Sequence, residues 1–201
     1  MLTVDTSFMN SNPVLTALRQ RNSAPKLDAP APDETQLDQM LRCALRSPDH
    51  GRLRPWRFVS FRASARDELG QLLESSLLRS NPQADEAARA KARSAPRRAP
   101  LVVAVMARIS EHPKVPAWEQ QLSAGCAAFA LELAAEALGY AAIWRTGSFC
   151  EDAELVKALG GAGEDRIVAF LYFGTPACNL KPVPDLDPDD FHERWDAVAD
   201  S

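Results

Sequence analysis

The segment from Arg46 to Phe58 gathers five side chains that carry or can carry positive charge. They are Arg46, His50, Arg52, Arg54 and Arg57. Guanidinium groups donate paired hydrogen bonds to phosphates and carboxylates, so this segment predicts a site for an anion. On this segment alone, a solvated basic connector between two elements is an equally good interpretation.

The surrounding sequence predicts a helix before this segment and a strand after it. Asp33 with Gln36 three residues later has the pattern of a capping box, and the apolar residues that follow recur at helical spacing. Pro48 cannot continue the helix, and residues 56–61 alternate large apolar with polar side chains, as a half-buried strand does. We therefore expect the five cations to lie together on a fixed surface loop.

A second cationic segment follows a short predicted helix near the N-terminus. Asn12-Pro13 has the pattern of an N-cap followed by proline at the first helical position. The helix leads to Arg21-Asn22-Ser23. This segment resembles the Arg-Arg-Ser opening of the FMN-dependent nitroreductase family.

The rest of the chain extends this resemblance. Ser47–His50 followed by Pro55–Phe58 is similar to the second flavin-contacting loop of the family. Further matches occur in the same order and at roughly the same spacing, at residues 114–120, 123–126, 139–147 and 170–176. The ordered set is that of a small bacterial subgroup of the family, and it spans nearly all of residues 14–176.

The resemblance implies a fold, a cofactor and a set of contact residues. The expected fold is an α+β domain with a central mixed sheet flanked by helices, in an intertwined homodimer with FMN at the subunit interface. FMN contacts are implied at Arg21, Asn22, Ser23, Arg46, His50, Trp144, Arg145 and Thr146. A contact to NADH or NADPH is implied at Ala134, Ala135, Glu136, Ala137, Leu138 and Gly139. Without the resemblance, the sequence predicts that Trp144 is a core residue and that Arg145 is a surface cation. It likewise predicts that residues 134–139 are the end of a buried helix.

The implied activity is transfer of hydride from a reduced nicotinamide through flavin to an electron-poor acceptor such as a nitroaromatic or a quinone. In such a reaction the side chains position and tune the flavin, so we nominate no catalytic acid or base. Because the chain has no GxGxxG fingerprint, the nicotinamide is expected to dock directly on the flavin. Two departures from the family are Asn22, in place of a second arginine, and Pro25, near a position where many members have a lysine; Lys26 or Arg54 are candidate replacements.

Composition and length set limits on the organisation. With 201 residues, 46% of them apolar, the chain suits a single core. We expect a loose leader over residues 1–12 and one domain over 13–201, whose proline-rich arm begins at about 177. The net charge of -4 argues against a general nucleic-acid binder. With neither a signal sequence nor a membrane-length apolar run, a cytoplasmic enzyme is expected.

Three apolar stretches predict the centre of the fold. Residues 100–107 and 167–173 read as strands covered on both faces. Residues 116–138 read as a helix that is apolar nearly all round, and therefore buried in the domain or at a subunit contact. Glu132 and Glu136 interrupt it, either as an acid-base pair or, more simply, in a salt bridge to an arginine. Cys43 and Cys126 lie in apolar helices and are expected to be reduced and to behave as small hydrophobic residues.

Two other functions remain open on the sequence. One is a protein that binds nucleic acid or another anion through residues 42–57 without any flavin. The other is a flavoprotein that holds FMN without turning over nicotinamide. A zinc site is disfavoured, because the cysteines and histidines lack ligand spacing.

Overall fold

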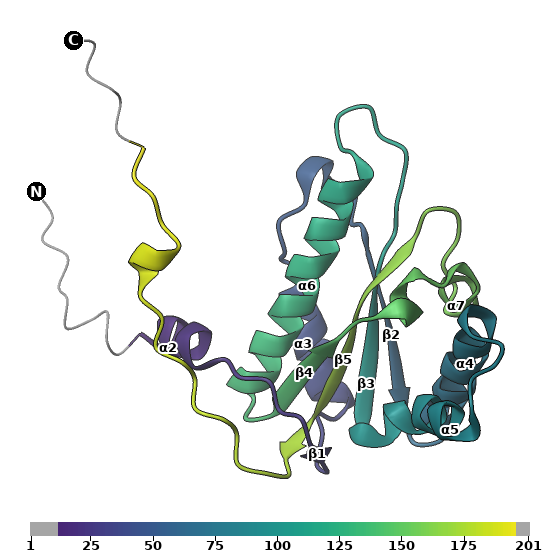
Figure 1. Ribbon diagram of the computed structural model, residues 1–201. Helices are drawn as coiled ribbons and strands as arrows, with labels where there is room; N and C mark the ends of the chain where they lie inside the picture. The colour runs from purple at the N-terminus through teal and green to yellow at the C-terminus, as the bar shows by residue number, and fades with distance from the viewer. Residues whose placement is uncertain (1–11, 196–201) are drawn as a thin grey trace, which may run out of the picture.

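The protein forms one five-stranded sheet with helices on both faces (Figure 1). This description rests on a computed structural model that describes residues 12–195. The strands are β1 (Leu27–Asp28), β2 (Trp56–Arg62), β3 (Leu101–Ala107), β4 (Ala141–Arg145) and β5 (Arg166–Pro176). β5 pairs with β3 along one edge, and with β4 and β1 along the other, while β2 pairs with β3.

All four ladders of this sheet are antiparallel. The parallel component of the expected mixed sheet is reduced to an isolated bridge between Ser23 and Ala142. Every residue of β3 is buried and β5 is buried over most of its length, as the continuous apolar runs predicted. The α+β fold expected from the sequence is confirmed.

Two helical layers cover the sheet. The helices are α2 (Pro13–Gln20), α3 (Glu34–Ala44), α4 (Ala65–Ser80), α5 (Glu86–Ser94), α6 (Ala117–Ala137) and α7 (Ala153–Ala158). On one face α3 and α6 pack on residues such as Val103 and Leu171; on the other, α4 and α7 pack on residues such as Val102 and Phe170. The capping box of Asp33 and Gln36 forms at the start of α3, as predicted.

Helix α6 has one buried and one exposed apolar face. Ala124, Ala128 and Leu131 are fully buried against the sheet. On the outer side, Trp118 is 59% exposed and Leu122 is 61% exposed. Side chains of this size are costly to leave in water, so the outer face of α6 is suited to a second protein surface.

Three other expectations meet different outcomes. Cys43 and Cys126 are free thiols, but both are exposed, so the expectation that they behave as small hydrophobic residues was wrong. Residues 1–11 of the predicted leader lie outside the described residues. The arm from about 177 is present as an extended, largely exposed segment through residue 195 (Figure 1).

In the described part of the chain, no helix has the length and apolar character needed to span a bilayer.

Candidate functional site

The loop after α3 is held on the N-terminal half of α6. The carboxylate of Asp49 accepts hydrogen bonds from the backbone N–H groups of Leu53 and Arg54, at 3.1 and 2.8 Å. The Ser123 hydroxyl donates to the carbonyl of Pro48 at 2.6 Å. His50 Nδ1 lies 2.7 Å from a carboxylate oxygen of Glu119 on α6. The turn held by the Asp49 carboxylate and the contacts from Ser123 and Glu119 together fix the position of His50.

The structure does not gather the cations of this loop, and the expectation that they lie together was wrong. Arg46 lines a groove of about 550 Å³ between α3 and α6, whereas Arg54 lines a separate hollow beside Arg108. The guanidinium of Arg57 reaches Gly160, where an added Cβ would lie 2.7 Å from Nη2. Asp49 turns the chain and β2 then carries Arg57 away, so the charges are spread over several surfaces. This spread weakens the case for one polyanion-binding loop.

Arg21-Asn22-Ser23 lies at the opposite end of α6. The backbone N–H of Asn22 donates to Glu136 Oε1 at 3.4 Å, and its side-chain amide donates to the carbonyl of Lys181 at 2.5 Å. Ser23 is exposed and bridges to Ala142 at the start of β4. The segment is therefore held by α6, by the edge of the sheet and by the C-terminal arm.

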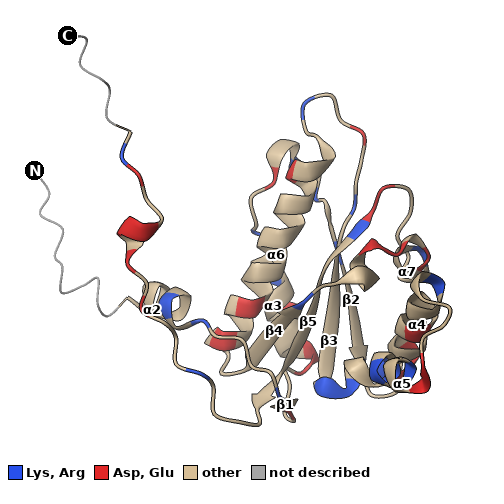
Figure 2. Ribbon diagram, in the orientation of Figure 1, with Lys and Arg blue, Asp and Glu red and all other residues tan. Residues whose placement is uncertain are grey.

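Two carboxylates of α6 shape the electrostatics beside Arg21. Glu132 is only 4% exposed and Glu136 is half-buried (Figure 2 shows acidic residues at the end of α6 nearest to α2). Burial raises the pKa of both carboxyls, and the positive charge of Arg21 partly offsets this rise. No ion pair joins Arg21 to either carboxylate in the described structure, so Arg21 acts on them at longer range than the predicted salt bridge.

The two cationic segments are far apart within one chain. One is anchored at Glu119 and the other at Glu136, and both anchors belong to the same straight helix. With a rise of 1.5 Å per residue, the anchors are about 25 Å apart along the helix axis. One protomer therefore does not bring Arg21 together with Arg46 and His50.

The predicted residues of β4 divide between the faces of the sheet. Trp144 packs on the α6 side, near Gly125, and its indole N–H donates to the carbonyl of Val168 at 3.2 Å. Arg145 points to the other face, where its guanidinium carbon lies 5.8 Å from the ring centre of Tyr172. Alternation along a strand requires this split. Thr146 follows the strand and is exposed.

The residues implied for nicotinamide lie at the end of α6. Ala135 is fully buried, and Ala134 and Leu138 pack against the same core. The others face a groove of about 620 Å³ that α2 and the chain near Asn22 also line. Those groove residues are Glu136, Ala137 and Gly139.

Some contacts of this region could not be found in the sequence. Glu119 and Lys181 contact the predicted residues His50 and Asn22 only because the fold joins distant segments. Lys91 in the polar helix α5 and Arg98 in the turn after it have the sequence pattern of ordinary surface cations, yet both line a cavity with Arg145. No local spacing distinguishes these four residues from their neighbours.

The fold is a helix-covered antiparallel sheet with the two predicted donor segments at opposite ends of α6, and comparison with known proteins gives its class. The Nitroreductase family model matches residues 18–175, and the chain belongs to this family. The "Putative NAD(P)H nitroreductase YdjA" of Escherichia coli K12 is 41% identical over 177 residues, covering 87% of this chain and 96% of that protein. A "Putative NAD(P)H nitroreductase" of Haemophilus influenzae is 39% identical, covering 80% and 87%. The predicted family, and the YdjA-like subgroup within it, are confirmed.

Solved structures share the fold. The nitroreductase-like family protein from Bacillus cereus superposes with a TM-score of 0.77 at 18% identity, covering 98% of this chain and 100% of that one. The nitroreductase with bound FMN from Bacteroides fragilis gives a TM-score of 0.72 at 20% identity, covering 92% and 100%. At these identities the likeness establishes the architecture alone.

Proposed function

We propose that this protein is an FMN-dependent NAD(P)H nitroreductase. It moves hydride from a reduced nicotinamide through flavin to an electron-poor acceptor such as a nitroaromatic or a quinone. The observation that carries the proposal is that both predicted flavin segments, Arg21–Ser23 and Arg46–His50, are fixed on α6 with accessible donors. The relatives at 41% and 39% identity are named as NAD(P)H nitroreductases, in agreement with this assignment.

The chemistry of the donor set fits FMN. Arg46 is exposed and has no carboxylate partner in the described structure, so its guanidinium is available to a phosphate. Arg21 supplies a second guanidinium, and the exposed hydroxyl of Ser23 suits the ribityl chain. His50, fixed by Glu119, keeps its other ring nitrogen for the flavin. Bound FMN supplies the hydride-accepting ring, while the protein supplies position and charge.

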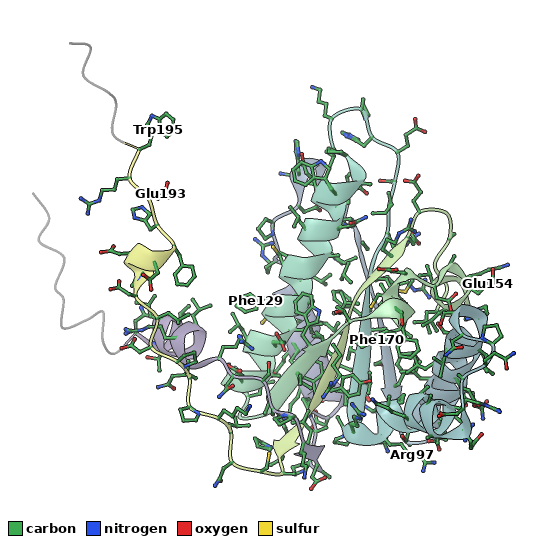
Figure 3. The ribbon with its side chains drawn as sticks, in the orientation of Figure 1. Arg97, Phe129, Glu154, Phe170, Glu193 and Trp195 are labelled. Carbon is green, nitrogen blue, oxygen red and sulfur yellow. The ribbon has the colours of Figure 1, made fainter. Side chains whose placement is uncertain are left out.

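The site is completed by a second copy of the chain. In a two-fold dimer each surface patch meets the same patch of the partner, so two antiparallel α6 helices place the first half of one beside the second half of the other. Arg21 of one protomer then lies beside Arg46 and His50 of its partner, although within one protomer these segments are at opposite ends of α6. The exposed apolar stripe of α6, which includes Phe129 (Figure 3), provides the contact surface.

The C-terminal arm is a second element for this dimer. Phe191 is 75% exposed and Trp195 is 97% exposed, and Figure 3 shows Trp195 pointing away from the domain. The backbone of the arm already contacts Asn22 through Lys181. An arm with large apolar side chains and no surface of its own to cover is suited to dock on the partner subunit.

Nicotinamide and acceptor use one position in turn. The groove lined by Glu136, Ala137 and Gly139 opens beside Asn22, so a dinucleotide lying there reaches the flavin segment directly. After it leaves, the acceptor takes its place, which gives ping-pong kinetics. We place this reaction in the cytoplasm, where reduced nicotinamides are available and where four free thiols are stable.

Colour is the direct test of this function. The purified protein is expected to be yellow, with flavin absorbance bands that bleach anaerobically on addition of NADH or NADPH and return on addition of a nitroaromatic. A colourless protein that takes up no FMN would refute the proposal, and retardation of an oligonucleotide would favour the anion-binding alternative. FMN binding without bleaching in anaerobic stopped-flow mixing would leave a flavoprotein with another electron donor.

A further inference from the structure

Reduction of a nitro group consumes a proton in addition to a hydride. Conversion to a nitroso group breaks one N–O bond and forms the two O–H bonds of a water molecule. A hydride from reduced flavin supplies both electrons and one hydrogen, so one proton must come from another source. This requirement rests on the proposed function, and it calls for an acid at the position of the acceptor.

Glu136 is an acidic side chain at that position. It lines the groove of about 620 Å³ between α2 and the end of α6, in which the acceptor is proposed to bind. Among the described residues that line this groove, no other has a carboxyl group and none has a positive charge. Glu136 Oε1 also accepts a hydrogen bond of 3.4 Å from the backbone N–H of Asn22, in a predicted flavin segment. The carboxyl therefore borders both the groove and the flavin segment.

No ion pair neutralises the carboxyl of Glu136 in the described structure. Of the two interpretations of Glu132 and Glu136 that the sequence leaves open, the salt bridge to an arginine is therefore not formed. Burial raises the pKa of Glu136, while the backbone N–H of Asn22 and the charge of Arg21 oppose this rise. A raised pKa lets a half-buried carboxyl retain its proton closer to neutral pH, as a general acid requires.

Glu132 lies one helical turn before Glu136 but does not reach the groove. It is only 4% exposed and is not one of the groove residues. The other ionisable groups on the elements around Glu136 are Arg19 on α2, Arg21 after it, Tyr140 before β4 and Lys181 on the arm. Of these, only Tyr140 lines the groove, and its hydroxyl donates to Gln36. Glu132 is thus a matched carboxyl on the same helix without access to the acceptor.

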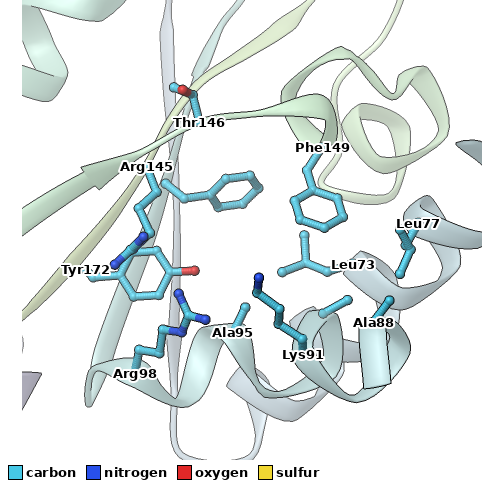
Figure 4. Close-up of a pocket in the computed structure, with 12 residues that line it drawn as sticks. Leu73, Leu77, Ala88, Lys91, Ala95, Arg98, Arg145, Thr146, Phe149 and Tyr172 are labelled. Carbon is cyan, nitrogen blue, oxygen red and sulfur yellow. The ribbon is translucent and has the colours of Figure 1, made fainter. Parts of the chain in front are cut away.

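The other places considered for a proton donor are less suitable. A cavity of about 400 Å³ on the opposite face of the sheet has no acidic residue among those described as lining it, and Figure 4 shows Lys91, Arg98 and Arg145 around it. His50 lies in a flavin segment, but its Nδ1 is 2.7 Å from Glu119 and its ring is outside the groove. Glu136 is therefore the acid that the geometry offers to the acceptor.

We propose that Glu136 is the catalytic acid that protonates the electron-poor acceptor during its reduction. The proton of the Glu136 carboxyl and a hydride from reduced flavin together convert a nitro group into a nitroso group and water. Glu136 is left as a carboxylate and regains a proton from water, to which its half-buried side chain has access. Hydride transfer from the nicotinamide to flavin consumes no proton, so that half of the cycle does not need Glu136.

The test measures the two half-reactions separately by anaerobic stopped-flow mixing, on wild type, Glu136→Gln and the control Glu132→Gln. Glutamine keeps an acceptor for the N–H of Asn22 but has no acidic proton to give. We expect oxidation of the reduced enzyme by nitrobenzene to slow on the order of a hundredfold in Glu136→Gln and to be unchanged in Glu132→Gln. Reduction by NADH or NADPH should be unchanged in both variants. Oxidation by ferricyanide, which takes electrons without a proton, should be unchanged as well.

A second readout does not depend on turnover. Carboxyl shifts of ¹³C-labelled glutamate in the flavin-free protein report the ionisation of Glu136, which is assigned by the signal missing in Glu136→Gln. We expect this carboxyl to ionise at higher pH than solvent-exposed glutamates, and ionisation at the same pH would overturn the proposal.

The kinetic outcomes are equally decisive. An unchanged rate with nitrobenzene in Glu136→Gln would overturn the proposal, as would equal slowing with nitrobenzene and ferricyanide, since a structural defect affects both acceptors. If neither NADH nor NADPH reduces the flavin, the proposed function fails, but nitrobenzene oxidation of dithionite-reduced enzyme still decides the role of Glu136.

Discussion

Substitution of Arg21 by alanine gives the sharpest test of the donor set. A hydrogen bond to a charged group contributes about 1.5 to 3 kcal/mol, which corresponds to a loss of FMN affinity of roughly ten- to 150-fold. Arg21 also opposes the rise in the pKa of Glu132 and Glu136 that burial causes, so its loss is expected to raise both pKa values further.

The assay is a titration of FMN into flavin-free protein, followed by quenching of flavin fluorescence. Arg19→Ala is the matched control, since Arg19 is exposed in the last turn of α2, two residues before Arg21. Thermal unfolding of both variants verifies that the fold is kept. An Arg21→Ala affinity equal to that of wild type, or an equal loss in Arg19→Ala, would refute the role assigned to Arg21.

Three further substitutions test other parts of the structure. Glu132→Gln removes a buried carboxyl whose pKa is raised by burial, so ionisation of Glu132 destabilises the wild-type fold. The variant should therefore be as stable as wild type in acid and increasingly more stable as pH rises through the raised pKa. A stability difference that is independent of pH in thermal unfolding would contradict this. Leu122→Glu puts a charge on the exposed stripe of α6 and should yield folded monomers in analytical ultracentrifugation, whereas an intact dimer would exclude this face as the interface. Gly70→Ala should destabilise the protein by about 1 to 3 kcal/mol in denaturant unfolding, because a Cβ would lie 2.1 Å from the carbonyl oxygen of Arg93 at the α4–α5 contact. An unchanged unfolding midpoint would show that α4 and α5 can move apart without loss of stability.

Much of the fold could be predicted from local patterns. The buried strands β3 and β5 were visible as continuous apolar runs, because a strand covered on both faces has no polar alternation. The start of α3 followed from Asp33 and Gln36, whose reciprocal hydrogen bonds need only residues three apart. The apolar circumference of α6 predicted a helix with two covered faces; one is covered by the sheet.

The arrangement of the site was less accessible. The charge density between Arg46 and Arg57 predicted one cluster, but side-chain direction depends on the turn at Asp49 and on which face of β2 each residue occupies. The exposure of Cys43 and Cys126 was missed for a related reason, since an apolar helix does not show which of its faces the sheet covers. The contacts that FMN and nicotinamide make with individual side chains stay predictions.

Mixed dimers test the central claim that two protomers build each flavin site. One protomer carries Arg21→Ala and the other Arg46→Ala, with different affinity tags so that only heterodimers are purified. If Arg21 acts together with Arg46 of its partner, one site keeps both arginines and the other loses both. We predict one FMN bound per heterodimer with wild-type affinity, although both homodimeric variants bind weakly. A heterodimer without any wild-type site would contradict the account.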